Sequence, residues 1–468
     1  MADDSICLQS ATELALLIRS RQISSRELLE LYLGRISRLN PDINAVVTVD
    51  EERARADAAR ADELTAAGGS EAPTGPLHGL PVTIKDAVEV AGMRSTGGSP
   101  ALAGHIPAAD APAVARLRRA GAVVTGKTNV PLWSGDIQTF NELFGTTSNP
   151  WDLSRTPGGS SGGPAAAVAA GLSSFELGTD IGGSIRIPSS FNGVFGHKPS
   201  FGVVPQRGYL DSVGGGGTEA DINVFGPIAR SPEDLLLLMG VLAGPDPDDA
   251  AAWRLSLPEA RHSRLADYRV GLCLNDPDCP IEAAAHDLLL DAAEALRRAG
   301  ANVRDEHPPL RLAEVRALFD RLLLAAVSVS LDEQVGQAIS GPHRDWLLMD
   351  RRRAELRQAW TAWFRDFDVL LCPVVPMLPF PHDQEGTVAE RWVLINGRSV
   401  PQADCLAWTG LVGVAYLPST VVPVGRVDGL PVGIQVVGPY LEDRTSLAVA
   451  SHLSELLGGF EAPPLALS

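Results

Sequence analysis

Residues 156–190 constrain the fold of this chain more than any other stretch. They contain three Gly-Gly pairs and five serines before Ser189. Consecutive glycines allow left-handed or crowded backbone angles and leave main-chain N–H groups exposed. Two segments, 158–163 and 178–184, are therefore predicted to be tight turns in which a serine hydroxyl lies beside unpaired donors. Acyl transfer requires a nucleophile next to preorganised N–H groups of this kind.

Composition and charge exclude several classes of partner. The 468-residue chain has a formal net charge of −18, with 45% hydrophobic and 21% charged residues. Such an excess of negative charge disfavours non-specific nucleic-acid binding and docking on anionic lipid. The longest apolar runs are short and interrupted, so we expect no segment to span a bilayer. We therefore expect neither a nucleic-acid nor a membrane partner.

The five cysteines indicate a reducing compartment. They are scattered and odd in number, and neither a CxxC motif nor a His/Cys cluster provides the spacing of a metal site. The N-terminal residues are acidic and lack the apolar core of a signal peptide. We therefore expect a cytoplasmic protein that uses no metal and no cofactor.

Segments typical of strands and of helices alternate along the whole chain. Strands are predicted near 80–85, 122–125, 269–274, 301–304, 368–372, 419–424 and 431–437. Helices are predicted within 10–40 and near 51–67, 111–120, 165–170, 231–243, 281–299, 311–338, 345–365 and 442–457. Within 10–40, Ser24 and Glu27 provide a capping box and Pro41 is expected to stop the helix.

This alternation predicts an α/β fold. We expect a single large α/β/α layered domain over residues 1–468, with a central mixed, largely parallel twisted sheet that helices cover on both faces. Residues 1–75 would supply N-terminal helices, and residues 76–240 the catalytic core motifs. Residues 241–468 would supply the remaining sheet, helices and substrate-pocket excursions.

Two motif matches are disfavoured by their context. Residues 121–128 fit the phosphate-loop pattern GxxxxGK[ST], but residues 122–125 are themselves a predicted strand, and Pro131 follows too closely for a long helix. Residues 159–163 fit G-x-S-x-G, which would make Ser161 a nucleophile on a strand-to-helix elbow. A polar loop precedes Ser161, and no histidine has a recognisable catalytic setting, so a Ser-His-Asp mechanism is the minority hypothesis.

Several separated motifs, in the right order, resemble the amidase signature family. The similarity is best over roughly residues 10–240 and looser beyond. The motifs are residues 79–86 (GLPVTIKD), 126–129 (GKTN), 144–145 (FG), 149–151 (NPW), 157–163 (PGGSSGG), 178–188 (GTDIGGSIRIP) and 429–435 (GLPVGIQ). Pro164 departs from the small residue usual in the family, but proline is well tolerated at the first position of a helix.

The resemblance implies a Ser-Ser-Lys catalytic set. Ser184 would be the nucleophile, Ser160 would relay its proton, and Lys85 would be the final base. Ser160 would follow an unusual cis peptide after Gly159.

The surroundings of this set also follow from the resemblance. The oxyanion hole would consist of the main-chain N–H groups of Ile181, Gly182, Gly183 and Ser184. Gly159, Ser161, Asp180 and Arg186 would support the site, with the last two paired. Trp133, Ser134, Ile137 and Gln138 would border the substrate.

Lysine can act as a base only when it is neutral. The pKa of Lys85 must therefore fall well below the reference value of about 10.4, and burial would lower it. A charged Asp86 beside the amine would oppose this. Because side chains alternate along a strand, Asp86 is expected to point to the opposite face.

We therefore expect a hydrolase that cleaves carboxylic amides, with esters and carbamates (urethanes) as further substrates. A glutamine-hydrolysing subunit of a tRNA-dependent amidotransferase is the alternative from another class. An inactive binding scaffold is disfavoured because Lys85, Ser160 and Ser184 are all present. The expected partner is a small-molecule amide, ester or carbamate, and a homodimer is an open alternative to a monomer.

Overall fold

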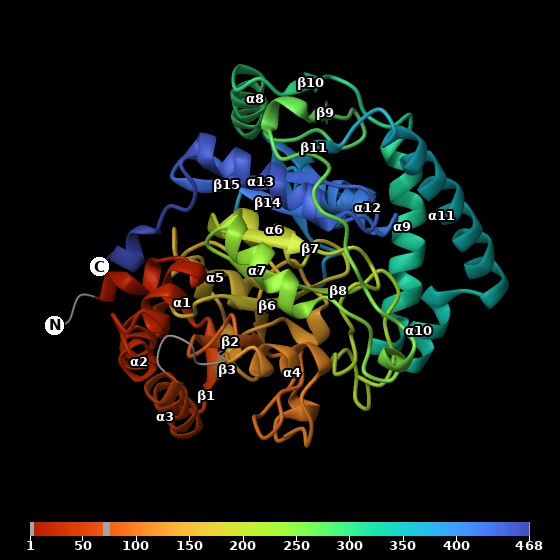
Figure 1. Ribbon diagram of the computed structural model, residues 1–468. Helices are drawn as coiled ribbons and strands as arrows, with labels where there is room; N and C mark the ends of the chain where they lie inside the picture. Colours follow the sequence, from red (N-terminus) through yellow and green to blue (C-terminus); the bar gives the residue numbers. More distant parts are fainter. Residues whose placement is uncertain (1–3, 69–74, 468) are drawn as a thin grey trace.

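An eleven-stranded mixed sheet organises the protein in this computed structural model, which describes residues 4–68 and 75–467. From one edge to the other, as the labels run from bottom to top in Figure 1, the order is β1-β3-β2-β6-β8-β7-β14-β15-β11-β9-β10. The strands are β1 (Val46–Val49), β3 (Val123–Thr128), β2 (Pro81–Lys85), β6 (Glu176–Asp180), β8 (Val224–Ala229), β7 (Phe195–Lys198), β14 (Ser419–Val427), β15 (Leu430–Val437), β11 (Val369–Pro373), β9 (Arg269–Leu272) and β10 (Asn302–Arg304).

The sheet is mixed, as predicted, but less parallel than expected. Among the described strands, four of the ten neighbouring pairs are parallel: β3–β2, β2–β6, β11–β9 and β9–β10. The other six pairs are antiparallel and include the whole centre of the sheet. One cause is a hairpin: β14 and β15 are joined through Asp428 and Gly429, whose φ angles are 52° and 81°. An Asp-Gly pair in sequence favours such a two-residue turn.

Helices cover both faces of this sheet, as predicted. They are α1 (Ala11–Arg19), α2 (Ser25–Ile43), α3 (Glu51–Gly68), α4 (Pro112–Arg119), α5 (Gly162–Ala169), α6 (Arg186–Asn192), α7 (Pro232–Leu242), α8 (Ala283–Arg298), α9 (Leu312–Val327), α10 (Glu333–Ser340), α11 (His343–Trp363), α12 (Ala407–Gly413) and α13 (Asp443–Leu457). Two small antiparallel pairs lie outside the main sheet: β4 (Phe140–Asn141) with β5 (Gly145–Thr146), and β12 (Trp392–Ile395) with β13 (Arg398–Pro401).

Side-chain alternation on β15 separates the two helical layers. A Cβ at Gly433 would lie 3.1 Å from the Ser190 side chain of α6, so this face of the strand meets α6. The alternate residues Ile434 and Val436 belong to the main apolar core, which also holds Leu453 of α13. Helix α6 and helix α13 therefore cover opposite faces.

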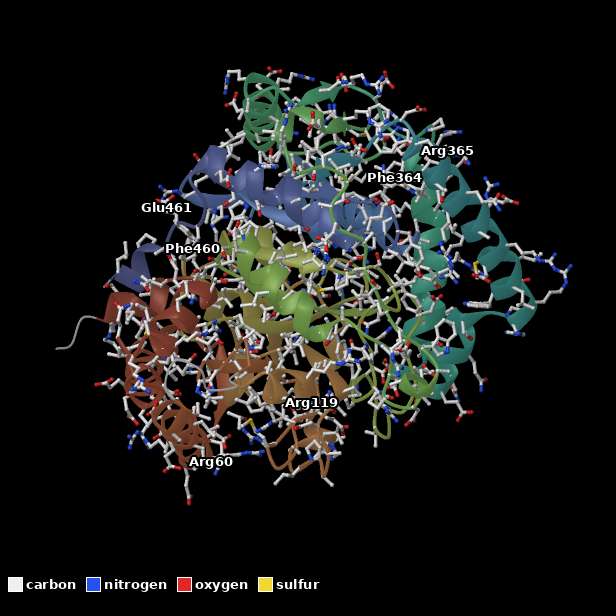
Figure 2. The ribbon with its side chains drawn as sticks, viewed as in Figure 1. Arg60, Arg119, Phe364, Arg365, Phe460 and Glu461 are labelled. Atoms are coloured by element: carbon white, nitrogen blue, oxygen red, sulfur yellow. The ribbon has the colours of Figure 1, made fainter. Side chains whose placement is uncertain are left out.

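Exposed charged side chains and buried apolar ones can be direct neighbours in sequence. Arg60 and Arg365, labelled in Figure 2, are exposed, whereas Phe364, next in sequence to Arg365, is only 4% exposed. Helices α9, α10 and α11 stand together at one side of the molecule (Figure 1). No helix within residues 4–68 and 75–467 is long and apolar enough to cross a membrane.

Two local predictions need correction. Helix α2 starts at the predicted Ser24–Glu27 capping box but continues past Pro41 to Ile43, where Asn44 in the left-handed region ends it. Pro41 has no N–H to donate to the preceding turn, and the helix ends two residues after it. The predicted helix 311–338 is broken at Ser328–Ser330. The predicted divisions at residues 75 and 240 stay predictions, and residues 1–3 and 69–74 lie outside the described part.

Asp234 connects helix α7 to the start of helix α1. This buried residue of α7 accepts hydrogen bonds from the first N–H groups of α1, at 2.9 Å from Ala11 and 2.8 Å from Thr12. The Thr12 hydroxyl donates to the same carboxylate at 2.8 Å. Helix N-termini present unpaired N–H groups, and a carboxylate is a favourable acceptor for them.

Asp234→Ala should therefore lower the free energy of unfolding by about 2 kcal/mol, because it leaves these buried donors unpaired. Urea denaturation followed by circular dichroism measures the change. Glu233→Ala is the matched control, since Glu233 is the exposed neighbour on the same helix turn. Equal stability of the two variants would contradict the capping role.

Candidate active site

The side chain of Lys85 is fully buried at the carboxyl end of β2. Its Nζ lies 2.7 Å from Ser160 Oγ and 2.7 Å from Thr179 Oγ1. The parallel pairing of β2 with β6 brings these groups together, because Thr179 lies at the same end of the neighbouring strand. A hydroxyl on either side of the amine thus replaces the water that burial removes.

Burial lowers the pKa of Lys85 well below its usual value. The carboxylates of Asp180 and Glu176 act in the opposite direction but do not outweigh the desolvation. Asp86 does not contribute a charge beside the amine. Its carboxylate accepts hydrogen bonds from the main chain and hydroxyl of Thr96, on the other side of the sheet, as strand alternation predicts.

The peptide bond between Gly159 and Ser160 is cis, as the resemblance implies. Ser160 itself is fully buried. A Cβ at Gly159 would lie 2.5 Å from the main-chain oxygen of Gln138 and 2.6 Å from that of Asp136. Only glycine therefore fits at the position that turns Ser160 toward Lys85.

Ser184 lies in the turn that follows β6, next to the Ser160 segment. The Ser161 N–H donates to the main-chain oxygen of Ser184 at 3.0 Å, which ties the two segments together. No direct hydrogen bond joins the Ser160 and Ser184 hydroxyls among the described residues. Ser184 is 8% exposed, whereas Lys85 and Ser160 are completely buried. Of the three, Ser184 is the one that a substrate can reach.

Asp180 shapes this turn from inside. It accepts hydrogen bonds from the N–H of Gly183 at 2.8 Å and from that of Ile185 at 3.1 Å. Gly183 has a φ of 120°, and a Cβ there would lie 2.8 Å from Thr409, so glycine is required. Because its N–H is already bound to a carboxylate, Gly183 is not a free donor, which corrects the predicted set of four.

The remaining predicted donors of the oxyanion hole are the N–H groups of Ile181, Gly182 and Ser184. Within the part of the chain that the structure describes, none of them donates a main-chain or side-chain hydrogen bond. The carbonyl of Gly182 is held from the other side by the Thr409 hydroxyl at 2.7 Å. The turn is thus fixed while these three N–H groups remain available.

Asp180 and Arg186 form the predicted buried pair. Arg186 Nε and Nη2 donate to the two carboxylate oxygens at 3.0 and 2.9 Å, and both side chains are 0% exposed. Arg186 also donates to the carbonyl of Thr409 and to the amide oxygen of Gln435, each at 2.9 Å. Burial opposes ionisation of Asp180, but the charge and hydrogen bonds of Arg186 outweigh it and lower the pKa of Asp180 to about 2.

Two of the predicted substrate-binding residues lie close to the Lys85 environment. Trp133 and Ser134 both have left-handed φ angles, of 50° and 58°. The Trp133 ring is half-buried and packs against Gly97, where a Cβ would lie 3.1 Å from two ring carbons. Ser134 is buried near the Tyr209 hydroxyl, which is also a neighbour of Thr179. Burial raises the pKa of Tyr209 to about 12, so this phenol is neutral.

The other two, Ile137 and Gln138, are engaged in packing and in internal hydrogen bonds. Ile137 is 6% exposed and belongs to a small apolar cluster with residues 374–405. Gln138 is 1% exposed, and its amide pairs in both directions with the main chain of Asp383. Gln138 thus links the loop that contains Asp383 to the segment whose main chain packs against Gly159. Contact of Ile137 or Gln138 with the substrate stays a prediction.

Sequence reasoning missed two polar residues of the site. Thr179 and Glu176 both lie within the glycine- and serine-rich stretch, yet neither was assigned a role. A usable signal was present for Glu176, since a charged residue between Phe175 and Leu177 in a buried strand requires partners. Thr179 could not be found this way, because threonine is common in strands for its packing alone.

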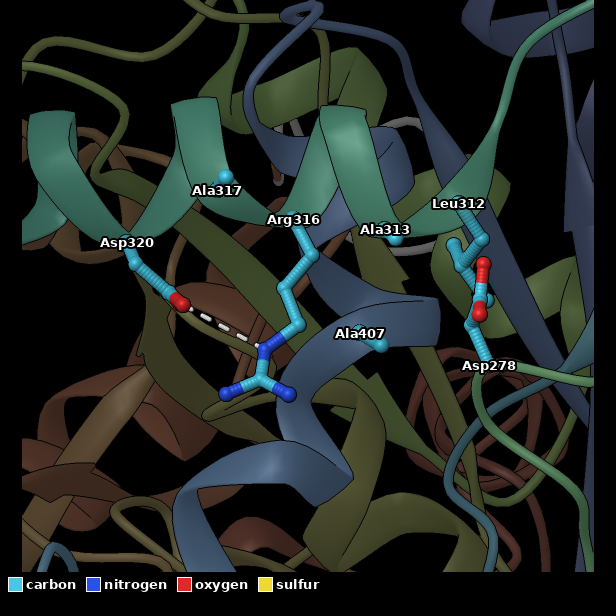
Figure 3. Close-up of a pocket in the computed structure, with 7 residues that line it drawn as sticks. All are labelled: Asp278, Leu312, Ala313, Arg316, Ala317, Asp320 and Ala407. Carbon is cyan, nitrogen blue, oxygen red and sulfur yellow. Dashed lines mark ion pairs between the residues drawn. The ribbon is translucent and has the colours of Figure 1, made fainter.

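A separate cavity of about 170 Å³ opens between α9 and α12 (Figure 3). Its lining includes Arg316, which forms ion pairs with Asp320 at 3.3 Å and Asp404 at 2.7 Å. None of the predicted site residues lines it. In the described ranges, no group of three His, Cys, Asp or Glu side chains is arranged to hold a metal ion.

The amidase family profile matches residues 27–348 and 315–447. The chain belongs to the amidase family. Among its relatives, a glutamyl-tRNA(Gln) amidotransferase subunit of Prochlorococcus marinus (strain MIT 9303) is 34% identical, with 93% of this chain and 94% of the relative covered. The fatty-acid amide hydrolase 2-A of Danio rerio is 30% identical, with 98% and 90% covered.

Solved structures of amidase signature enzymes share the fold. A bacterial aryl acylamidase of that family superimposes with a TM-score of 0.79 at 28% identity, covering 96% of both chains. A 6-aminohexanoate cyclic dimer hydrolase superimposes with a TM-score of 0.80 at 28% identity, covering 98% of this chain and 99% of the other. These matches confirm the amidase signature resemblance and the layered α/β fold.

The Asp180–Arg186 pair makes a prediction about stability. Arg186→Met leaves a buried carboxylate unpaired and should lower the free energy of unfolding by about 3–5 kcal/mol. Since the pKa of Asp180 is lower in the folded protein than in the unfolded chain, the pair's contribution is complete above about pH 4 and is lost as the pH falls toward about 2. Urea denaturation of wild type and variant at several pH values measures both effects.

The matched control is Arg264→Met, because Arg264 pairs with Asp267 on the surface and is 73% exposed. It should leave the unfolding midpoint nearly unchanged. Equal loss of stability in both variants, or an Arg186→Met effect that does not shrink at acid pH, would count against the buried pair.

Proposed function

We propose that this amidase family member is a serine hydrolase that cleaves carboxylic amide bonds through an acyl-enzyme on Ser184. The observation that carries the proposal is the 2.7 Å contact between a fully buried Lys85 and Ser160. A buried lysine of lowered pKa can accept a proton at neutral pH. Ser160 would pass that proton from Ser184, and the hydrogen bond from the Ser161 N–H to the Ser184 carbonyl, at 3.0 Å, supports this by holding the two segments together.

The reaction proceeds in two halves. Ser184 Oγ attacks the carbonyl carbon as its proton passes through Ser160 to Lys85, and the carbonyl oxygen becomes negative. The free N–H groups of Ile181, Gly182 and Ser184 would stabilise that oxyanion. Collapse of the intermediate breaks the C–N bond, and the proton returns to the leaving amine. Water then attacks the Ser184 ester along the same route and releases the acid.

The surroundings of the turn favour an apolar substrate. Gly182 packs against the side chains of Phe319 and Leu406, whose carbons lie 3.6 and 3.9 Å from the position of a Cβ on that glycine. Apolar side chains beside the turn suit an alkyl or aryl group better than the charged groups of free glutamine. Esters and carbamates form the same kind of tetrahedral oxyanion, so we include them, and urethane cleavage with them, in the proposed substrate range.

Covalent labelling tests the nucleophile. A fluorophosphonate should label the wild-type protein once, and Ser184→Ala should abolish the label, because no other serine of the described residues combines exposure with the Lys85 relay. Intact-protein and peptide mass spectrometry measure both. Ser161→Ala is the matched control: it removes the serine of the disfavoured G-x-S-x-G hypothesis and should remain labelled, at a reduced rate. A label that persists in Ser184→Ala but is lost in Ser161→Ala would reverse the assignment.

A second candidate is the glutamine-hydrolysing subunit of a tRNA-dependent amidotransferase, favoured by the 34% identity to an amidotransferase relative. Assays on the purified chain separate the two functions. A self-sufficient amidase should turn over p-nitroacetanilide and related aryl and alkyl amides steadily while releasing no ammonia from glutamine. Ammonia release from glutamine, without turnover of simple amides, would favour the amidotransferase role.

The homodimer and the cytoplasmic setting stay predictions. All five cysteines are buried and free.

A further inference from the structure

Glu176 is a buried carboxyl group for which the mechanism above has no use. It is the first residue of β6 and is 0% exposed. Its neighbour across the antiparallel pair is Ile228 of β8, so one flank of the side chain is apolar. A carboxyl group in such a place is costly unless hydrogen bonds satisfy it.

Three donors converge on this carboxyl group. Oε1 accepts from the hydroxyls of Thr83 at 2.6 Å and Thr128 at 2.8 Å. Oε2 accepts from the main-chain N–H of Leu177 at 3.1 Å. An ionised carboxylate only accepts hydrogen bonds, so a set made entirely of donors suits the charged form.

The carboxylate lies on the same face of the sheet as the Lys85 side chain. Thr83 pairs with Glu176, and Thr128 pairs with Lys85. Because side chains two residues apart on a strand share a face, Thr83 and Lys85 point the same way. The next residue of β6 on that face is Gly178, which places no side chain between the carboxylate and the amine. The side chains of Glu176 and Lys85 therefore start as diagonal neighbours, and the charge of Glu176 acts on Lys85 through space.

Other charged groups near Lys85 are already matched. Asp180 is paired with Arg186. Lys127 acts on Glu176 through space, but its Nζ points to the opposite face, where it donates to the carbonyl of Val88 and to Ser95. Asp86 lies on that opposite face too.

The elements packed against this face add no further charge. Helix α5 covers it with the sequence GGPAAAVA, and β8 has no titratable side chain. The nearby buried cations Arg35 and Arg230 are bound to main-chain carbonyls of residues 168–173. Glu176 is thus the one carboxyl group beside Lys85 without an arginine partner in the described chain.

The Glu176 carboxyl group ionises within the pH range in which the proposed enzyme would work. Burial raises its pKa to about 7, against the opposing hydrogen bonds of Thr83 and Thr128. The group is therefore about half ionised near neutral pH, carries its charge in alkaline solution and loses it in acid.

We propose that Glu176 is a positioning residue that holds a negative charge beside Lys85 and thereby sets the lower end of the pH range in which the base works. This inference rests on the proposed role of Lys85. When Lys85 takes the proton it becomes an ammonium ion in a desolvated site, and a neighbouring carboxylate stabilises that ion. Without it, the buried amine would stay neutral at lower pH but would be a weaker base.

The rate constant for labelling of Ser184 by a fluorophosphonate, measured from about pH 5 to about pH 10, tests the proposal, because the rate follows the fraction of neutral Lys85. In the plot of this rate constant against pH, the acid limb is the part where the rate falls as Lys85 becomes protonated, and the plateau is the constant rate at higher pH. Glu176→Gln and Glu176→Met should both move the acid limb to lower pH, by on the order of one unit, and lower the plateau. A merely structural role would lower the plateau and leave the limb in place.

Asp86→Asn is the matched control: it removes another buried carboxylate, next in sequence to Lys85 but on the opposite face, and should not move the limb. Thr128→Val keeps Glu176, removes one donor and should shift the limb in the same direction, which covers the case that both Glu176 variants fail to fold. An unmoved limb in every folded variant at Glu176 or Thr128 overturns the inference. Near-normal labelling in Lys85→Ala would instead overturn the proposed function.

Discussion

The desolvation of one amine is the constraint on which the rest of the site depends. Lys85 is completely enclosed, and the only polar atoms that its Nζ contacts in the described chain are the hydroxyls of Ser160 and Thr179. In water the amine would be an ammonium ion; in this enclosure its charged form is disfavoured. Gly159 and Gly183, in the two turns, help to enclose the amine, because the main chain at these positions packs where a Cβ would not fit.

The sheet explains why such a site can form at all. Strands β2 and β6 are parallel, so their carboxyl ends deliver Lys85 and the 180–184 turn to the same edge. The buried Asp180–Arg186 pair then fixes the turn from within, and Thr409 of α12 holds it from the far side. The nucleophile is left at the surface of this rigid arrangement, with 8% exposure, while the base behind it has none.

Much of the site could be predicted because its geometry is imposed by residue types with few alternatives. Several motifs in the order of a known family indicated Lys85, Ser160 and Ser184, whereas a lysine at a strand end or a serine in a glycine-rich turn would not have done so alone. The strand predicted at residues 122–125 likewise disfavoured a phosphate loop at Lys127, and the structure shows that this strand, β3, continues through Gly126 and Lys127 to Thr128. Helix α2 begins where its capping box predicted.

Other features depended on contacts between distant segments, which local patterns do not encode. The engagement of the Gly183 N–H by Asp180 removes a predicted oxyanion donor, and only the folded turn reveals it. The environment of Glu176 depends on hydrogen bonds from Thr83 and Thr128, which are 93 and 48 residues away in sequence. The antiparallel centre of the sheet was missed for a similar reason, since strand pairing is a long-range choice that alternation of elements does not determine.

The protonation state of Lys85 is the most direct test of the account. Proteins labelled with ¹³C at lysine Cε, as wild type and as Lys85→Ala to assign the signal, allow its titration to be followed by NMR. We predict a midpoint well below the reference value of about 10.4, coinciding with the acid limb of Ser184 labelling. A Lys85 signal that remains that of an ammonium ion up to about pH 10, while Ser184 is still labelled rapidly at neutral pH, would contradict the account.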